Sequence, residues 1–120
     1  MRILIVKTTS MGDVVHAVPV VEDIKRFISD AEIDWLVEDS FADIPRHVAG
    51  VSEVIECSVR KWKKRVFEKA TRDQIKALRE KLRSKHYDLV IDLQGLIKSA
   101  VLASWTNAPV AGYDRRSGKE

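Results

Sequence analysis

Cysteine is nearly absent from this sequence of 120 residues, which contains only Cys57. A single cysteine excludes a disulfide bond within the chain and fits a protein of a reducing compartment. A catalytic thiol would need an activating context, and none is visible around Cys57. We therefore expect an ordinary cysteine near the end of a strand.

Long hydrophobic runs are missing as well. No apolar run reaches the roughly 18 residues that a membrane-spanning helix needs. The N-terminal run over 3–6 is too short for a signal peptide, and no small-residue cleavage site follows it. Repeats, low-complexity segments and internal linkers are also absent from the sequence. We expect a single domain over residues 1–120, located in the cytoplasm.

Charge is present in an ordinary amount but is unevenly distributed. Charged residues make up 32% of the chain and hydrophobic residues 45%, which is typical of a soluble globular domain. The formal net charge is +3, yet the segment 60–85 contains twelve basic and three acidic residues. Such a positive field favours an anionic partner: a nucleic acid, a phospholipid surface or a phosphorylated substrate. The simpler interpretation, favoured after Thr71, is a solvated helix face.

Strand-like and helix-like patterns alternate along the chain. Continuous apolar runs predict strands over 3–6, 33–37, 51–55, 87–93 and 109–113. Helical spacing predicts helices over 14–28, 40–48, from residue 71 and over 96–105. Strands that alternate with helices pair in parallel through crossover connections. We therefore expect an α/β fold, Rossmann-like and doubly wound, with a mostly parallel sheet.

Three local signals bear on the helix boundaries. Pro19 either kinks the first helix or begins its main part after a short turn. Ser40 is the expected N-cap of the second helix. Thr71 and Gln74 have the spacing of a capping box, and a narrow apolar stripe follows them at Ile75, Leu78 and Leu82.

Ligands of doubly wound sheets bind at the carboxyl ends of strands, and the loop 7–13 is one such end. Gly12 permits close backbone approach there, and the amides at a helix start attract anions. A dinucleotide fingerprint needs three glycines and a P-loop needs Gly-Lys-Ser/Thr, and the loop has neither. Asp13 is either the N-cap of the following helix or a catalytic base. The two roles are compatible if the carboxylate is partly free.

A second polar strand end covers residues 92–99. Gln94 and Gly95 follow the strand, and Lys98 falls in the first turn of the next helix. The helix dipole disfavours a cation at that position, so Lys98 either meets an anionic partner or extends into solvent. We prefer the first interpretation and expect Lys98 to line a binding site.

The basic segment Arg60-Lys61-Trp62-Lys63-Lys64 mixes cations with one large aromatic side chain. It would suit phosphates or carboxylates, with Trp62 as a stacking or interfacial anchor, and also single-stranded nucleic acid. The alternative is an exposed basic loop whose tryptophan fills a gap. His16 could face the same cleft as Asp13, but a structural role at the helix surface is favoured. His47 and His86 lie in unrelated contexts, so no metal site is expected.

Taken in order, these segments resemble the heptosyltransferases that add the first heptose to the inner core of lipopolysaccharide. The resemblance rests on Ile5–Val14, Asp34–Glu38, Arg60–Lys64 and Tyr87–Ala100. The Gln-Gly-Leu-x-Lys-Ser string at 94–99 is similar to the first-type enzymes and differs from the second type, which adds the next heptose. The match covers essentially the whole chain.

The resemblance implies the N-terminal half of a glycosyltransferase-B fold, in which two Rossmann-like domains face each other across a cleft. The N-terminal domain would bind the acceptor, Kdo-lipid A, and the C-terminal domain the donor, ADP-heptose. Transfer would be inverting and would need no cofactor or bound metal. By the same resemblance, Asp13 would be the general base that takes the proton from the attacking Kdo hydroxyl.

The other residues of the implied site come from the same segments. The phosphates and Kdo carboxylates of the acceptor would be engaged by Arg60, Lys61, Lys63 and Lys64. The cleft would be lined by Lys7, Ser10, Gly12, Gln94 and Lys98. The resemblance further implies a peripheral protein at the cytoplasmic face of the inner membrane, with no nucleic-acid partner.

The family is considerably longer than this chain, and its nucleotide-sugar domain is absent here. The chain alone is therefore expected to be inactive. One alternative is a non-catalytic module for anionic lipid or nucleic acid that uses the positive field of residues 60–85. Another is a different sugar transferase of the same superfamily, because the determinants of donor specificity lie in the absent domain.

Overall fold

The computed structural model describes residues 1–112, except for the side chain of Ile97. The strands are β1 (Arg2–Val6), β2 (Glu32–Glu38), β3 (Val51–Cys57), β4 (Leu89–Asp92) and β5 (Val110–Gly112). The helices are α1 (Met11–Phe27), the 3-10 turn η1 (Asp39–Phe41), α2 (Asp43–Arg46), α3 (Val59–Lys64), α4 (Lys69–Ser84) and α5 (Ile97–Ser104). Within these residues, no helix has the length and apolar character needed to cross a membrane.

The five strands form one sheet in the order β3-β2-β1-β4-β5, and every neighbouring pair is parallel. This confirms the predicted α/β class and parallel sheet. The chain builds outward from β1 to β3 and then crosses to β4 on the other side of β1. The carboxyl ends of β1 and β4 therefore lie side by side, with Val6 opposite Asp92. Such a switch point is where doubly wound sheets bind ligands.

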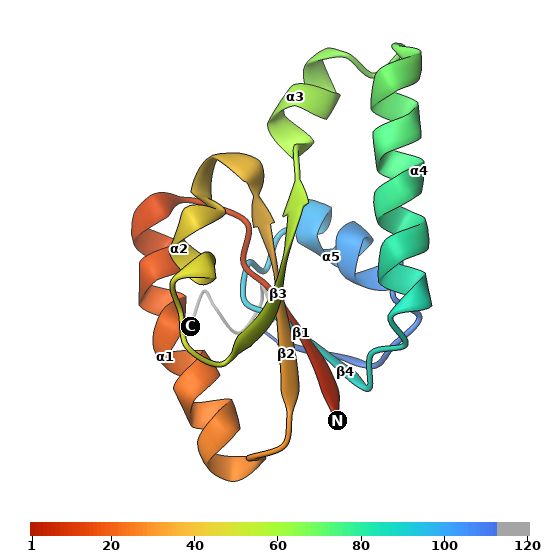
Figure 1. Cartoon of the computed structure of the whole chain (residues 1–120). Coiled ribbons are helices and arrows are strands. Elements are labelled where there is room, and N and C mark those ends of the chain that lie inside the picture. Colours follow the sequence, from red (N-terminus) through yellow and green to blue (C-terminus); the bar gives the residue numbers. More distant parts are fainter. Residues whose placement is uncertain (113–120) are drawn as a thin grey trace.

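Helices cover both faces of the sheet, with α1 and α2 on one face and α4 and α5 on the other (Figure 1). Alternate strand residues feed two cores: Ile3 and Ile5 pack toward α1, whereas Leu4 and Val6 pack toward α4 and α5. Because both faces are buried, β1 is apolar from Ile3 onward instead of alternating with polar residues. The short helix α3 stands above the carboxyl edge of the sheet, where β3 ends (Figure 1).

The start of α1 differs from the prediction. The N-cap is Ser10, so Asp13 lies in the first helical turn and is not the cap. The helix then continues through Pro19 to Phe27, which excludes the interpretation in which Pro19 begins the main helix. The physical reason is that the missing N–H of proline costs one hydrogen bond, which the packing of Val14, Val21 and other buried residues on the sheet outweighs.

Two further expected helix starts are wrong. Ser40 lies inside η1, and α2 begins only at Asp43. The helix α4 begins at Lys69, with Glu68 as the N-cap position. Thr71 is buried, and the Gln74 side chain accepts a hydrogen bond from Trp62 Nε1 at 2.9 Å, so the capping box does not form. The expected strand at 87–93 is reduced to β4, and part of the last expected strand, Tyr113, lies outside the described residues.

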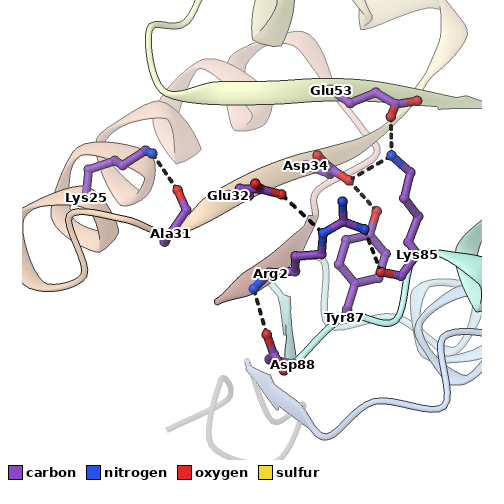
Figure 2. A network of polar contacts seen from close by, with 9 residues as sticks. All are labelled: Arg2, Lys25, Ala31, Glu32, Asp34, Glu53, Lys85, Tyr87 and Asp88. Carbon is purple, nitrogen blue, oxygen red and sulfur yellow. Dashed lines mark hydrogen bonds and ion pairs between the residues drawn. The ribbon is translucent and has the colours of Figure 1, made fainter.

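The amino edge of the sheet is held by a network of ion pairs and hydrogen bonds (Figure 2). Arg2 pairs with Glu32 at 3.1 Å, and Lys85 Nζ lies 3.6 Å from Asp34 and also contacts Glu53. The hydroxyl of Tyr87 donates to the buried Asp34 carboxylate at 2.6 Å. Burial and this hydrogen bond both raise the pKa of Tyr87. Arg2, Lys85 and Asp34 therefore each have a partner of opposite sign, and Asp88 accepts a hydrogen bond from the backbone N–H of Arg2 at 2.8 Å.

Candidate anion-binding site

The loops after β1 and β4 are joined by one side chain, that of Gln94. Its Oε1 accepts hydrogen bonds from the backbone N–H groups of Thr8 at 3.1 Å and Thr9 at 3.4 Å. Its Nε2 donates to Thr9 Oγ1 at 3.2 Å. The sequence prediction placed Gln94 in the cleft as a ligand contact. In the structure, both ends of its amide are bonded to the neighbouring loop, so it also shapes the cavity wall.

The loop after β4 owes its shape to Asp92. One carboxylate oxygen accepts from the backbone N–H groups of Gln94 at 2.9 Å and Gly95 at 3.2 Å, and the other accepts from Ser99 Oγ at 3.0 Å. Gly95 has a φ of 68°, in the left-handed region that a residue with a Cβ adopts only with strain. This turn directs the chain into α5 and places Lys98 in the first turn of that helix, as predicted.

Lys7 is tied to the same strand ends. Its Nζ donates to the carbonyl oxygen of Leu93 at 3.3 Å, and its own carbonyl oxygen accepts from Trp35 Nε1 at 3.0 Å. The Lys7 side chain is half-buried between the β1 and β4 loops. It therefore contributes positive charge at the switch point while connecting the two loops.

The basic helix α3 is anchored by a carboxylate that sequence reasoning did not single out. Glu38, the last residue of β2, is 2% exposed and accepts from the backbone N–H groups of Val59 at 3.3 Å and Arg60 at 3.1 Å. These two amides begin α3 and have no partner within the helix. The buried charge of Glu38 is thus stabilised by the helix start, and the position of α3 is fixed relative to the sheet.

Asp39 adds a second link between β2 and α3. Its carboxylate accepts from Ser58 Oγ at 2.9 Å and lies 3.4 Å from Lys61 Nζ. Burial opposes the charged form, but the hydrogen bond from Ser58 and the charge of Lys61 hold the pKa of Asp39 below its ordinary value. The only sequence signal for both anchors was a pair of acids at the end of a buried strand.

The helical geometry of α3 divides its four cations into two pairs. Arg60 and Lys63, one turn apart, line a cavity of about 220 Å³ at the carboxyl edge of the sheet. Lys61 faces a different hollow between α3 and α4, together with Asp39, and Lys64 lines a third beside Glu68. The structure therefore brings only half of the predicted basic cluster to the switch point.

Trp62 lies between these two pairs and is buried, with 8% of its surface exposed. Its ring packs in the core beneath α3, and its indole N–H is bonded to Gln74. The hypothesis that Trp62 is a stacking or interfacial anchor is therefore wrong. Its burial agrees with the alternative of a tryptophan that fills a gap, although the segment is a helix and not a loop.

The cavity at the switch point combines cations with polar and apolar groups. It is lined by Thr8, Thr9, Glu38, Val59, Arg60, Lys63, Gln94, Leu96, Lys98, Ser99 and Leu102. Four of the residues predicted from the sequence are in this set. Among the described residues, no ion pair within 4.0 Å involves Arg60, Lys63 or Lys98. The guanidinium of Arg60 lies instead over the Phe41 ring, 5.6 Å from its centroid.

The other residues predicted to line the cleft are not in the lining of this cavity: Lys7 directly follows β1, and the rest lie at the start of α1. Ser10, Gly12 and Asp13 are exposed, and a Cβ on Gly12 would meet no atom within 4 Å. The space beside Gly12 is open, and the close approach of a ligand to its backbone stays a prediction. Within residues 1–112 the Asp13 carboxylate forms no hydrogen bond or ion pair. It is exposed at the carboxyl edge of the sheet, where a ligand can reach it.

Two further sequence predictions concern the thiol of Cys57 and a metal site. Cys57 is buried, and burial together with the neighbouring Glu38 raises the pKa of its thiol. This confirms an ordinary cysteine at a strand end. No group of three or more His, Cys, Asp or Glu side chains suited to a metal ion occurs in the described part of the chain.

Comparison with known proteins gives matches along the chain. The family described as Glycosyltransferase family 9 (heptosyltransferase) matches residues 75–119. Lipopolysaccharide heptosyltransferase 1 of Pseudomonas aeruginosa is 42% identical over 121 residues, which cover all of this chain and 34% of that protein. The protein of the same name from Escherichia coli K12 is 47% identical over 104 residues, or 87% of this chain and 33% of that protein.

A solved structure matches this chain in both sequence and fold. The structure described as E. coli heptosyltransferase WaaC with ADP-2-deoxy-2-fluoro heptose has a TM-score of 0.92 and 44% sequence identity. The match covers all of this chain and 38% of that one. The chain spans about a third of the length of the curated relatives that it matches, and it corresponds to their N-terminal portion.

Proposed function

This chain is homologous to the N-terminal portion of the heptosyltransferases of glycosyltransferase family 9, and on that premise we propose that it serves heptose transfer in lipopolysaccharide synthesis. Its part in that reaction is to bind the acceptor and to supply the general base. The observation that carries the proposal is the cavity at the switch point, which Arg60, Lys63 and Lys98 line without forming an ion pair among the described residues. The one acid in its lining, Glu38, is bonded to the first amides of α3. The acceptor is Kdo-lipid A, whose phosphates and carboxylates match three unpaired cations.

Asp13 acts as the base. The acceptor hydroxyl attacks the anomeric carbon of the heptose and forms the new glycosidic bond. The bond from that carbon to the diphosphate oxygen breaks on the opposite face, so the configuration is inverted and the electron pair leaves with ADP. The hydroxyl proton passes to the Asp13 carboxylate, which is exposed and has no partner in the described chain to compete for it.

Arg60, Lys63 and Lys98 act mainly by holding the acceptor in place. Arg60 presents a planar guanidinium that suits a carboxylate or phosphate in two-point contact, and Lys63 and Lys98 add charge on either side of it. Contact with the negative groups of the acceptor is favoured because none of these three cations forms an ion pair within the described chain. Lys61 and Lys64 contribute to the wider positive field rather than to direct contact.

In the proposed reaction the donor, ADP-heptose, binds to a second domain that faces this one across the cleft. No bound metal or other cofactor takes part. Because the acceptor is a membrane lipid, the protein works at the cytoplasmic face of the inner membrane as a peripheral protein.

A binding titration tests the acceptor assignment. The chain is titrated with deacylated Kdo-lipid A, with ADP-heptose and with a single-stranded oligonucleotide at matched ionic strength. We expect binding of the first ligand only, weakened by Arg60→Ala and Lys63→Ala. Tight binding of the oligonucleotide with no affinity for the lipid headgroup would instead favour a nucleic-acid module.

A further inference from the structure

An apolar groove runs beside the cationic cavity, between α3, α4 and α5. It has a volume of about 320 Å³, within the range of small-molecule sites. Its walls include Val59 and Ile75, Val101 and Trp105, and the only charged residues in its lining are Lys63 and Lys98. Val101 is 47% exposed, although an apolar side chain on a helix is more often covered.

The groove and the cavity adjoin each other. Four residues line both of them: Val59, Lys63, Lys98 and Leu102. Lys63 and Lys98 therefore stand at the boundary between a polar compartment and an apolar one. Lysine suits such a boundary because its methylene stem packs against apolar groups while its ammonium group stays in the polar compartment.

We propose that this groove binds the hydrocarbon chain of an amphiphile whose anionic head lies in the cavity. The inference rests on the proposed function only in requiring that the cavity takes anionic groups. Charge complementarity selects this occupant over an apolar segment of protein. A protein segment laid along the groove would cover Lys63 and Lys98 without neutralising them, which is unfavourable for a buried charge. An amphiphile neutralises both ammonium groups with its own head.

The experiment compares butyl, hexyl and octyl phosphate, each below its micelle concentration, as calorimetric ligands of the chain. The headgroup is constant, so the difference between ligands reports on the hydrocarbon chain alone. A buried methylene group contributes about 0.8 kcal/mol, so each added pair should tighten binding by about tenfold. We expect this gradient in the unmodified protein.

Matched variants test whether the groove causes the dependence of affinity on hydrocarbon chain length. Val101→Asp places a charge in the groove, and we expect it to remove the dependence of affinity on chain length. Val15→Asp is the control, because Val15 is 49% exposed on α1, on the opposite face of the sheet. Arg60→Ala should weaken all three ligands by the same factor, because Arg60 lines the cavity but not the groove.

The outcomes separate the two proposals. Equal affinity for the three phosphates, or a gradient that persists in Val101→Asp, would overturn the groove proposal and leave the cavity intact. A failure of all three ligands to bind would overturn both. Sedimentation of the same samples addresses the other occupant: a dimer that Val101→Asp dissociates would show that the groove seats a second copy of the chain and would overturn the proposal.

Discussion

The two edges of the parallel sheet carry charged side chains in opposite arrangements. At the amino edge, Arg2 and Lys85 each meet a carboxylate, and the buried Asp34 also accepts a hydrogen bond from Tyr87 (Figure 2). At the carboxyl edge, Arg60 and Lys63 are exposed and have no acidic partner among the described residues. The amino-edge cations named here are thus paired within the chain, whereas these two cations of the carboxyl edge are not.

The difference shows how one fold separates stability from binding. Paired charges at the amino edge connect β1, β2 and β3 to the segment before β4, so they hold the sheet together. At the carboxyl edge the loops are held instead by hydrogen bonds from backbone N–H groups to neutral or buried side chains, namely Gln94, Asp92 and Glu38. Arg60, Lys63 and Lys98 form no ion pair there within the described chain, although Lys61 pairs with Asp39. Substitutions at the two edges should therefore affect different measurements.

The largest expected effect is on turnover and comes from Asp13. In a complete transferase that carries this sequence, Asp13→Ala should lower kcat by about 10²–10⁴-fold, because the acceptor hydroxyl loses its base. Acceptor affinity and thermal stability should change little, since the carboxylate has no partner in the described chain. Asp23→Ala is a matched control, because Asp23 is also exposed on α1. Near-normal turnover of Asp13→Ala would remove Asp13 as the base.

The next largest effect concerns the amino edge. Tyr87→Phe should lower the free energy of unfolding by about 2 kcal/mol, because the Asp34 carboxylate stays buried without its hydroxyl donor. Denaturant titration measures this change. Affinity for phosphate at the carboxyl edge should be the same as in the unmodified protein. A Tyr87→Phe protein with normal stability and weakened phosphate binding would contradict the division between the edges.

A smaller effect should distinguish the two faces of α3. Lys63→Ala should weaken phosphate binding by about tenfold, as expected for one lost charged hydrogen bond. Lys61→Ala removes the same charge from the same helix, but Lys61 faces Asp39 and not the cavity, so we expect less than a threefold change. Titration of both variants at one salt concentration makes the comparison. Equal losses would mean that the general positive field, and not the cavity, determines affinity.

The smallest effect is a pH dependence of stability at the amino edge. Hydrogen bonds from Lys81 and Lys85 hold the pKa of Glu53 below its ordinary value of 4.5. A depressed carboxyl pKa stabilises the fold above the unfolded value and loses that contribution as the pH falls through the folded value. Glu53→Gln should therefore flatten the stability profile below about pH 4.5. Glu80→Gln, on an exposed acid of α4 that forms no ion pair within the described chain, should leave the profile unchanged.

Sequence reasoning predicted the architecture better than the local boundaries. The buried strands were recognisable because residues such as Ile3 and Val90 belong to continuous apolar runs, and the alternation with helices implied parallel pairing. Boundary signals failed where a tertiary contact used the residue instead. Gln74 had the spacing of a capping box, but its amide is bonded to Trp62, which lies on another helix.

The candidate site was predicted in composition but not in geometry. The sequence identified Arg60, Lys63, Gln94 and Lys98, which line one cavity. It did not separate Arg60 from Lys61, because the rotation of a short helix depends on how its ends are held. That constraint comes from Glu38, which is 21 residues from Val59 in the chain, and no local pattern reports a contact over such a separation.

Glu38 holds the first two amides of α3 in place. The number of residues between β3 and Arg60 therefore determines which side chains of α3 face the cavity. Successive residues of an α-helix are rotated by about 100° around its axis. One residue inserted between Cys57 and Val59 would let Glu38 bind the preceding pair of amides. Val59 and Trp62 would then take the places of Arg60 and Lys63 in the cavity lining, and this pair of cations would turn away from it. Net charge and composition would barely change. The number of residues in this turn, more than the number of lysines, therefore decides what the carboxyl edge can recognise.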